Sequence, residues 1–190
     1  MDNLLEIVGV AVGAIYLWLE YRASIYLWIA SIVMPAIYLV VFYGAGLYAD
    51  TAINIYYLII ALYGFINWRR GNSDGQELKI TRTSTREWIA MAAVYAVAQL
   101  VLSYVLVRFT DSDVPHLNAA TAALSIVGMW MLARKWLEQW IVWIVVDIAS
   151  AALYLYKGLE PTAILYTIYA IIAIFGYRKW LTIMNQDADR

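Results

Sequence analysis

Long apolar runs separated by short polar segments dominate the chain. A helix that crosses a bilayer needs about 20 largely apolar residues. Seven runs approach or reach that length, at residues 4–19, 24–43, 52–68, 88–107, 117–133, 138–156 and 161–177. The first contains Glu6 and lacks a basic leader and a small-residue cleavage site, so we interpret it as a retained helix and not as a signal peptide. The pattern predicts an all-α membrane protein with seven transmembrane helices.

Composition supports a membrane environment. The 190 residues are 64% hydrophobic and 14% charged, and the mean hydropathy is +0.68. A water-soluble domain of this length needs more charged surface, whereas apolar side chains are stable against lipid. The absence of cysteine excludes disulfides and thiolate metal sites. We find no phosphate-binding loop, nucleophile–base pair or metal cluster, so we expect no enzyme, ATP-driven pump, cofactor, bound metal or nucleic-acid partner.

Basic residues are strongly segregated between the two sides of these helices. Of the 13 Lys and Arg residues, only Arg108 and Lys157 fall on the side of the N-terminus. Basic loops stay in the cytoplasm, so the N-terminus is expected outside and the C-terminus inside a bacterial inner membrane. The longest polar segment, "RRGNSDGQELKITRTSTRE", lies on the cytoplasmic side and is basic enough to rest on anionic lipid. It is expected to end in a helix N-cap at Ser84 or Thr85.

An internal repeat organises the seven runs. An offset of 112 residues superimposes Gly46-Leu47 on Gly158-Leu159 and aligns five further pairs: Arg22 with Arg134, Trp28 with Trp140, Tyr57 with Tyr169, Gly64 with Gly176, and Trp68 with Trp180. The alternative is that aromatic-rich membrane helices simply look alike. The offset moves the chain by four helices, an even number, so both triplets would have the same orientation in the membrane.

This parallel repeat predicts a 3+1+3 plan, as in SWEET-like transporters, with the substrate site near the membrane midplane between the halves. The expected parts are a first three-helix repeat (1–68), a cytoplasmic loop with a connector helix (69–110), a second three-helix repeat (111–180) and a cytoplasmic tail (181–190).

Four segments stand out for their aromatic and glycine pattern: "GLYAD", "NIYYLIIALYGFINWRRG", the tryptophan-rich sixth run ending in "LYLYKGL", and "ILYTIYAIIAIFGYRKW". Together they resemble the PnuC family of bacterial vitamin transporters. The resemblance covers roughly residues 4–180. It implies a SWEET-like fold and energy-independent uptake of a vitamin precursor, namely nicotinamide riboside or, in some branches, thiamine or riboflavin. It also implies a functional link to a cytoplasmic kinase that traps the substrate. A homo-oligomer is compatible with the sequence.

Asp147 is the leading candidate site residue. A charge at the bilayer centre costs about 2.5–3.5 kcal/mol even on lenient scales, and such residues normally face a cavity or a partner. Trp136, Trp140, Trp143 and Asp147 are spaced to share a helix face, and Trp136 falls in the interfacial belt. Aromatic rings beside a carboxylate suit a flat cation. The alternative is a protonated Asp147 that hydrogen-bonds between helices, with belt tryptophans around it.

Other polar or special residues within the runs are secondary candidates. The repeat places Pro35 opposite Asp147, so Pro35 is either a hinge or gate, or a kink that serves packing. Asn54 and Tyr57 on the third run and Gln99 on the fourth are candidate substrate-binding groups, or ties between helices.

The charge at Asp147 bears on the choice of substrate. Nicotinamide riboside and thiamine are both flat cations, whereas uncharged riboflavin fits a carboxylate worst. Nicotinamide riboside leads as the default of the family, although its members tend to carry an amide near this position. Thiamine is a close second, because "WLEYRASIYLW" and "MPAIY" are similar to thiamine-type members. A seven-helix receptor or an intramembrane enzyme is a more remote alternative.

Overall fold

The computed structural model describes residues 13–44, 48–71 and 78–188, and these are almost entirely helical. Residues 13–21 are helical, and six helices with defined bounds follow: α2 (Leu27–Gly44), α3 (Tyr48–Arg70), α4 (Thr85–Phe109), α5 (Pro115–Ala133), α6 (Gln139–Tyr156) and α7 (Glu160–Ala188). The prediction of an all-α chain is confirmed for the described residues. Glu6 and most of the first predicted run lie outside them.

Four of the described helices, α4 to α7, are long and apolar enough to cross a membrane, and Leu27–Val40 forms a shorter apolar helix. The α4 helix exposes most of its apolar side chains, including Val97 and Leu100. A contiguous apolar surface of this kind is unfavourable in water but not against lipid tails. The chain is therefore a multi-pass membrane protein.

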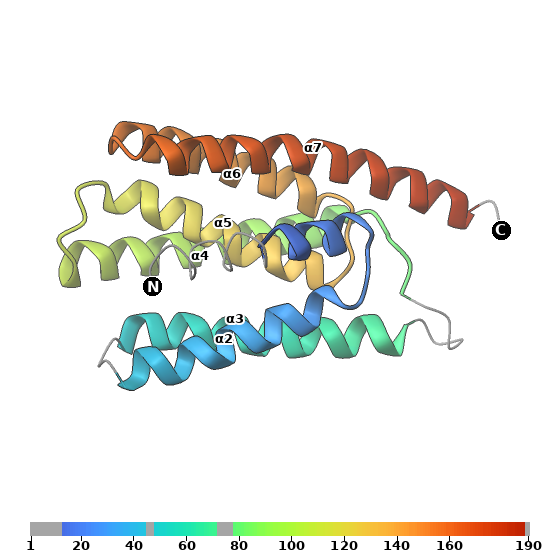
Figure 1. The fold of residues 1–190 in the computed structure, drawn as a ribbon, viewed down its shortest axis with the longest axis horizontal. Coiled ribbons are helices and arrows are strands. Elements are labelled where there is room, and N and C mark those ends of the chain that lie inside the picture. The colour runs from blue at the N-terminus through green and yellow to red at the C-terminus, as the bar shows by residue number, and fades with distance from the viewer. Residues whose placement is uncertain (1–12, 45–47, 72–77, 189–190) are drawn as a thin grey trace. The chain divides into compact units, whose positions relative to one another are not determined.

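The chain divides into two compact units, and each is described here by itself. The first comprises residues 1–79 with 187–190, and the second comprises residues 80–186. In the first unit α2 and α3 lie side by side as a helical hairpin (Figure 1). In the second, α5 packs against both α4 and α6, and α7 packs along α6 through aromatic pairs.

The same corner of backbone precedes α2 and α6. In each corner a residue other than glycine adopts positive φ: Ala23 at 51° and Lys135 at 59°. Matching backbone hydrogen bonds surround them, since the N–H groups of Arg22 and Arg134 donate to carbonyls four residues earlier, each at 3.1 Å. Left-handed backbone is unfavourable for side chains with a Cβ, so its recurrence 112 residues later indicates a constraint that both corners share.

A tryptophan inserted against a glycine packs the helices of each unit. Trp28 on α2 is fully buried, lies over Gly64 on α3 and meets Trp68 edge-on at 5.6 Å and 85°. In the second unit Trp140 lies over Gly176 in the same way, and its ring meets that of Trp180 edge-on at 5.7 Å and 89°. The residues that revealed the repeat in sequence are therefore the residues that hold α2 to α3 and α6 to α7.

One element boundary and one residue placement differ from the expectation. The α7 helix continues to Ala188, through most of the segment expected to be a tail. Trp136 precedes α6 and is buried against Met91, Val127 and Val142, so its assignment to the interfacial belt is wrong. It lies in the corner between α5 and α6, which packs an indole more completely than a helix end in contact with lipid.

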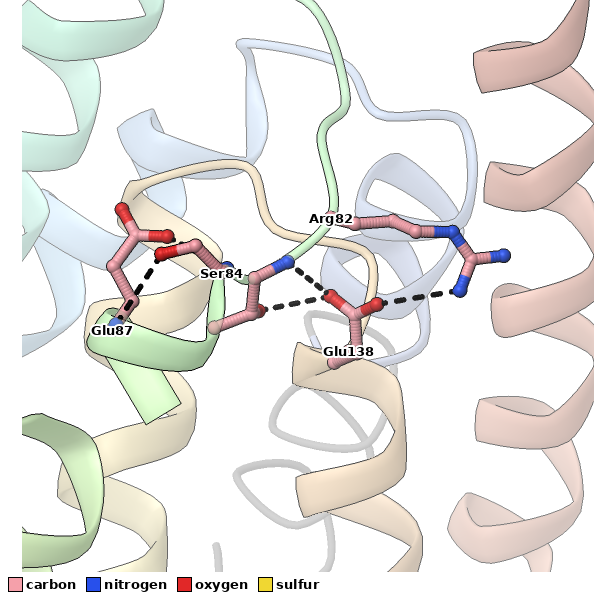
Figure 2. Close-up of polar contacts among 5 residues, drawn as sticks. Arg82, Ser84, Glu87 and Glu138 are labelled. Atoms are coloured by element: carbon pink, nitrogen blue, oxygen red, sulfur yellow. Dashed lines mark hydrogen bonds and ion pairs between the residues drawn. The ribbon is translucent and has the colours of Figure 1, made fainter. Parts of the chain in front are cut away.

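The segment before α4 is fastened to the corner between α5 and α6 (Figure 2). Oε2 of Glu138 accepts hydrogen bonds from the backbone N–H and the hydroxyl of Thr83, at 2.8 and 2.9 Å, and Oε1 lies 3.7 Å from Arg82. Thr81 pairs with Trp136 in an isolated parallel bridge. Ser84 is the N-cap of α4, as predicted, and completes a capping box with Glu87.

Replacing Glu138 is expected to loosen this attachment. Glu138→Gln removes the charge that strengthens both hydrogen bonds from Thr83, and charge-assisted bonds contribute about 1.5–3 kcal/mol. We expect a lower thermal midpoint for the purified protein in detergent. Glu87→Gln alters a side chain at the same end of α4 that is 31% exposed, and glutamine can keep the capping hydrogen bond from Ser84, so this variant serves as the control with a smaller effect. An equal midpoint for Glu138→Gln and the wild type would contradict the attachment.

Candidate functional site

Asp147 lies in the middle of α6 and is only 7% exposed. No side chain in the described part of the chain forms a hydrogen bond or ion pair with it. Its carboxyl group is close enough to Tyr166 and Tyr169 on α7 to interact electrostatically with both phenol groups. A buried carboxylate with phenols nearby and no cationic side chain among the described residues can accept a cation or a hydrogen bond from a ligand.

Three tyrosines form a continuous aromatic surface beside Asp147. Tyr154 on α6 stacks on Tyr166, with ring centroids 5.2 Å apart and planes inclined by 24°. Tyr166 then meets Tyr169 edge-on, at 5.7 Å and 68°. Tyrosine faces attract a cation within about 6 Å. The arrangement therefore combines a carboxyl group with π faces on two adjacent helices of the second unit.

Trp143 lies one turn before Asp147 on α6 and is half-buried. Its indole lies against Gly128 on α5, where a Cβ would come within 3.2 Å of the ring. Its Nε1 is buried and has no hydrogen-bond partner in the described residues, although a buried indole N–H usually has one. Trp143 also packs against the core cluster that contains Val127 and Val142, and its contact with substrate stays a prediction.

Trp140 does not share the surroundings of Trp143. It is 1% exposed and wedged between Gly176 and Trp180 on α7. Residues three apart on a helix differ in direction by about 60°, which directs Trp140 towards α7 and Trp143 towards α5. The common face expected for the tryptophans is thus divided between two neighbouring helices. Trp140 packs α6 against α7, and its Nε1 is also buried without a partner in the described residues. Its role in binding stays a prediction.

The candidates of the first unit lie on α2 and α3. Pro35 is buried within α2, which continues through it. Asn54 and Tyr57 are half-buried on α3, and Tyr57 lies 5.6 Å from Tyr56 in a tilted ring contact. Asn54 also has a partner in the structure. Their roles as gate and ligands remain predictions.

Gln99 on α4 forms a hydrogen bond with the first turn of α5. Its Nε2 donates to the hydroxyl of Ser103 at 3.2 Å and to the carbonyl of His116 at 3.1 Å. Its Oε1 is buried without a partner in the described residues. The donor side of this amide therefore ties α4 to α5, and the acceptor side is available to another group.

Sequence reasoning missed Tyr166 and undervalued Tyr169. The 112-residue offset maps Asn54 and Tyr57, both chosen as candidates, onto Tyr166 and Tyr169. The same offset maps Pro35 onto Asp147. Applying the repeat to the candidates themselves would therefore have found the two tyrosines. A buried acid in the first unit, Glu20, was also overlooked.

The site offers no ligand set for a metal. Among the described residues, no three His, Asp or Glu side chains lie close enough to hold a metal ion. What the arrangement can do is bind: it presents a carboxyl group, phenols and an indole N–H from α6 and α7, and no nucleophile beside a base.

Comparison with known families and proteins finds matches over almost the whole chain. The sequence model of the nicotinamide mononucleotide transporter family matches residues 3–182. The nicotinamide riboside transporter PnuC of Escherichia coli strain K12 is 22% identical over 211 residues, covering 98% of this chain and 88% of the relative. The riboflavin/roseoflavin transporter RibM of Streptomyces davaonensis is 27% identical over 186 residues, covering 96% and 87%.

A solved structure shares this fold. The crystal structure of a vitamin B3 transporter PnuC superimposes with a TM-score of 0.72 and 25% sequence identity. The match covers 97% of this chain and 83% of the solved chain. The similarity therefore extends over both units and all six helices with defined bounds.

Proposed function

We propose, from the premise that this chain belongs to the nicotinamide mononucleotide transporter family, that it takes up nicotinamide riboside across the inner membrane of a bacterium. The resemblance read from the sequence is confirmed. The chain is a membrane transporter and not an enzyme. The observation that carries the choice of substrate is Asp147, a buried carboxyl group that lies beside aromatic rings and has no hydrogen-bond or ion-pair partner among the described residues, in a chain related to nicotinamide riboside transporters.

The chemistry of the site matches a pyridinium nucleoside. The positive ring supplies the charge that Asp147 lacks among its neighbours, and each desolvated cation–π contact contributes about 2 kcal/mol. The stacked faces of Tyr154 and Tyr166 and the indole of Trp143 are the surfaces on which a flat ring would lie. The phenol of Tyr169 would donate to the ribose hydroxyls or to the carboxylate, whereas the hydroxyl of Tyr166 already forms a hydrogen bond with that of Tyr154.

Transport is proposed to proceed by facilitated diffusion in the SWEET-like 3+1+3 plan. The repeated corners and the repeated tryptophan–glycine packing support two equivalent three-helix repeats with α4 as the connector. Alternating access would proceed by rocking of one repeat against the other. The proposed orientation has the N-terminus outside and the basic C-terminus in the cytoplasm. A cytoplasmic kinase would trap the imported nucleoside, because a phosphorylated product no longer fits the exit route.

Thiamine is the second candidate, favoured by the charge at Asp147. Its thiazolium is also a flat cation, and a carboxylate binds a cation more strongly than an amide would. Riboflavin, named as cargo of the Streptomyces relative, is uncharged and would leave a buried carboxyl group unpaired, which is costly.

Uptake into liposomes tests this proposal. Purified protein is reconstituted without ATP or an ion gradient, and entry of radiolabelled nicotinamide riboside is followed. We expect uptake that stops when inside and outside concentrations are equal, and continued accumulation when a nicotinamide riboside kinase and ATP are enclosed. Uptake no faster than in empty liposomes would refute the assignment of this substrate.

A further inference from the structure

A second buried polar group on α6 is not used by the site described so far. Gln139, the first residue of α6, is 0% exposed. Neither its Oε1 nor its Nε2 has a hydrogen-bond partner in the described part of the chain. An amide buried without compensation costs about 1–3 kcal/mol. Burial of this side chain therefore lowers the stability of the folded protein.

The corner itself does not require an amide at this position. The repeat places Leu27 at the position of Gln139, and Leu27 is also 0% exposed. The backbone hydrogen bonds of the two residues match as well: each N–H donates to the carbonyl three residues earlier, at 3.2 Å for Leu27 and 3.3 Å for Gln139. An apolar side chain therefore fills the same backbone environment, and the amide of Gln139 needs another explanation.

The direction of Gln139 on α6 is fixed by its neighbours. Val142 and Val146 belong to the core shared with α4 and α5, whereas Trp140 and Asp147 face α7. At 3.6 residues per turn, Gln139 lies between these two sides of the helix. Trp143 lies on the same side of α6 as Gln139, and its Nε1 also lacks a partner in the described residues. One face of α6 thus carries successive unpaired polar groups.

We propose that Gln139 is a substrate-binding residue that pairs with the carboxamide of nicotinamide riboside. The inference rests on the proposed function. Among the described residues, neither the acceptor nor the donor of this side chain has a partner; the two lie in one plane, and a primary carboxamide offers the complementary pair. A hydroxyl would satisfy only one of the two at a time. Gln139 is eight residues from Asp147, which corresponds to about 12 Å along the helix. This distance can hold, one after another, a carboxylate–cation contact, an aromatic ring and an amide–amide hydrogen bond.

The test measures binding of two ligands by isothermal calorimetry. One is nicotinamide riboside, and the other is its analogue without the carboxamide, the pyridinium riboside. Gln139→Leu, which copies the first repeat, and Gln139→Met, which keeps an unbranched shape, are compared with the wild type. We expect about tenfold weaker binding of nicotinamide riboside by both variants, unchanged binding of the analogue, and a thermal midpoint without ligand equal to or above that of the wild type.

Three results would overturn the inference. Unchanged affinity for nicotinamide riboside would show that the amide does not contact the substrate. Equal losses for both ligands would show that any contact does not involve the carboxamide. A large fall in the thermal midpoint of both variants would make Gln139 a structural residue. A wild-type protein that binds neither ligand would instead be a failure of the proposed function, and with it of this inference.

Discussion

Asp147→Asn is expected to weaken the binding of nicotinamide riboside by about tenfold or more. The substitution keeps the size of the side chain and removes only the negative charge. Asp147 is buried beside Tyr166 and Tyr169, without a cationic side chain to pair with in the described residues. A buried charge pair lost from a binding site costs about 2–5 kcal/mol, so a tenfold change, equivalent to about 1.4 kcal/mol, is a lower bound.

Asp113→Asn is the matched control for this prediction. Asp113 is an exposed carboxylate that forms an ion pair with Lys157 at 3.2 Å, and exposed pairs contribute little to stability. We expect wild-type affinity for this variant by calorimetry. If Asp147→Asn binds nicotinamide riboside as tightly as Asp113→Asn does, the ion pair with the substrate is wrong, and Asp147 is a neutral group that joins helices.

Gly176→Ala is expected to cause a large loss of stability. A Cβ at this position would lie 2.7 Å from three atoms of the Trp140 ring. The indole is rigid, 1% exposed and wedged against Trp180, so it has no free space to move into. Overpacking of this kind typically costs about 1–3 kcal/mol and occasionally more. We expect a markedly lower thermal midpoint and less folded protein after membrane extraction.

The chain offers both a repeat partner and a control for this substitution. Gly64→Ala meets the ring of Trp28 even more closely, and should be at least as harmful. Gly44→Ala, at the end of α2, places a Cβ in open space and should be neutral or stabilising by up to about 1 kcal/mol. Similar midpoints for Gly176→Ala and Gly44→Ala would contradict the proposed wedge between α6 and α7.

The helices and their repeat could be predicted because both depend on local or periodic features of the sequence. Apolar runs of membrane length set the helices, and α5 and α6 begin and end within two residues of the expected bounds. The repeat was visible because tryptophan and glycine are uncommon and form one wedge twice. Trp28 and Gly64 cannot vary separately without loss of that packing.

The details of the site depended on contacts between helices, which one sequence does not contain. Helical spacing placed Trp140 and Trp143 on one broad face, and only the position of α5 and α7 separates a packing residue from a candidate ligand. Tyr166 is one of 16 tyrosines and becomes notable only beside Asp147. Gln139 lies at a helix end, where a polar residue is ordinary, and its burial follows from the corner before α6.

The central claim is that this transporter recognises a flat cationic vitamin precursor through Asp147. It is tested most directly by calorimetric titration of purified protein with nicotinamide riboside, thiamine and riboflavin under identical conditions. We predict tight binding of nicotinamide riboside, loss of that binding in Asp147→Asn and no binding of riboflavin. Tight binding of thiamine alone would replace the proposed substrate and leave the carboxylate–cation site in place. Tight binding of riboflavin, with neither cation bound, would contradict the account.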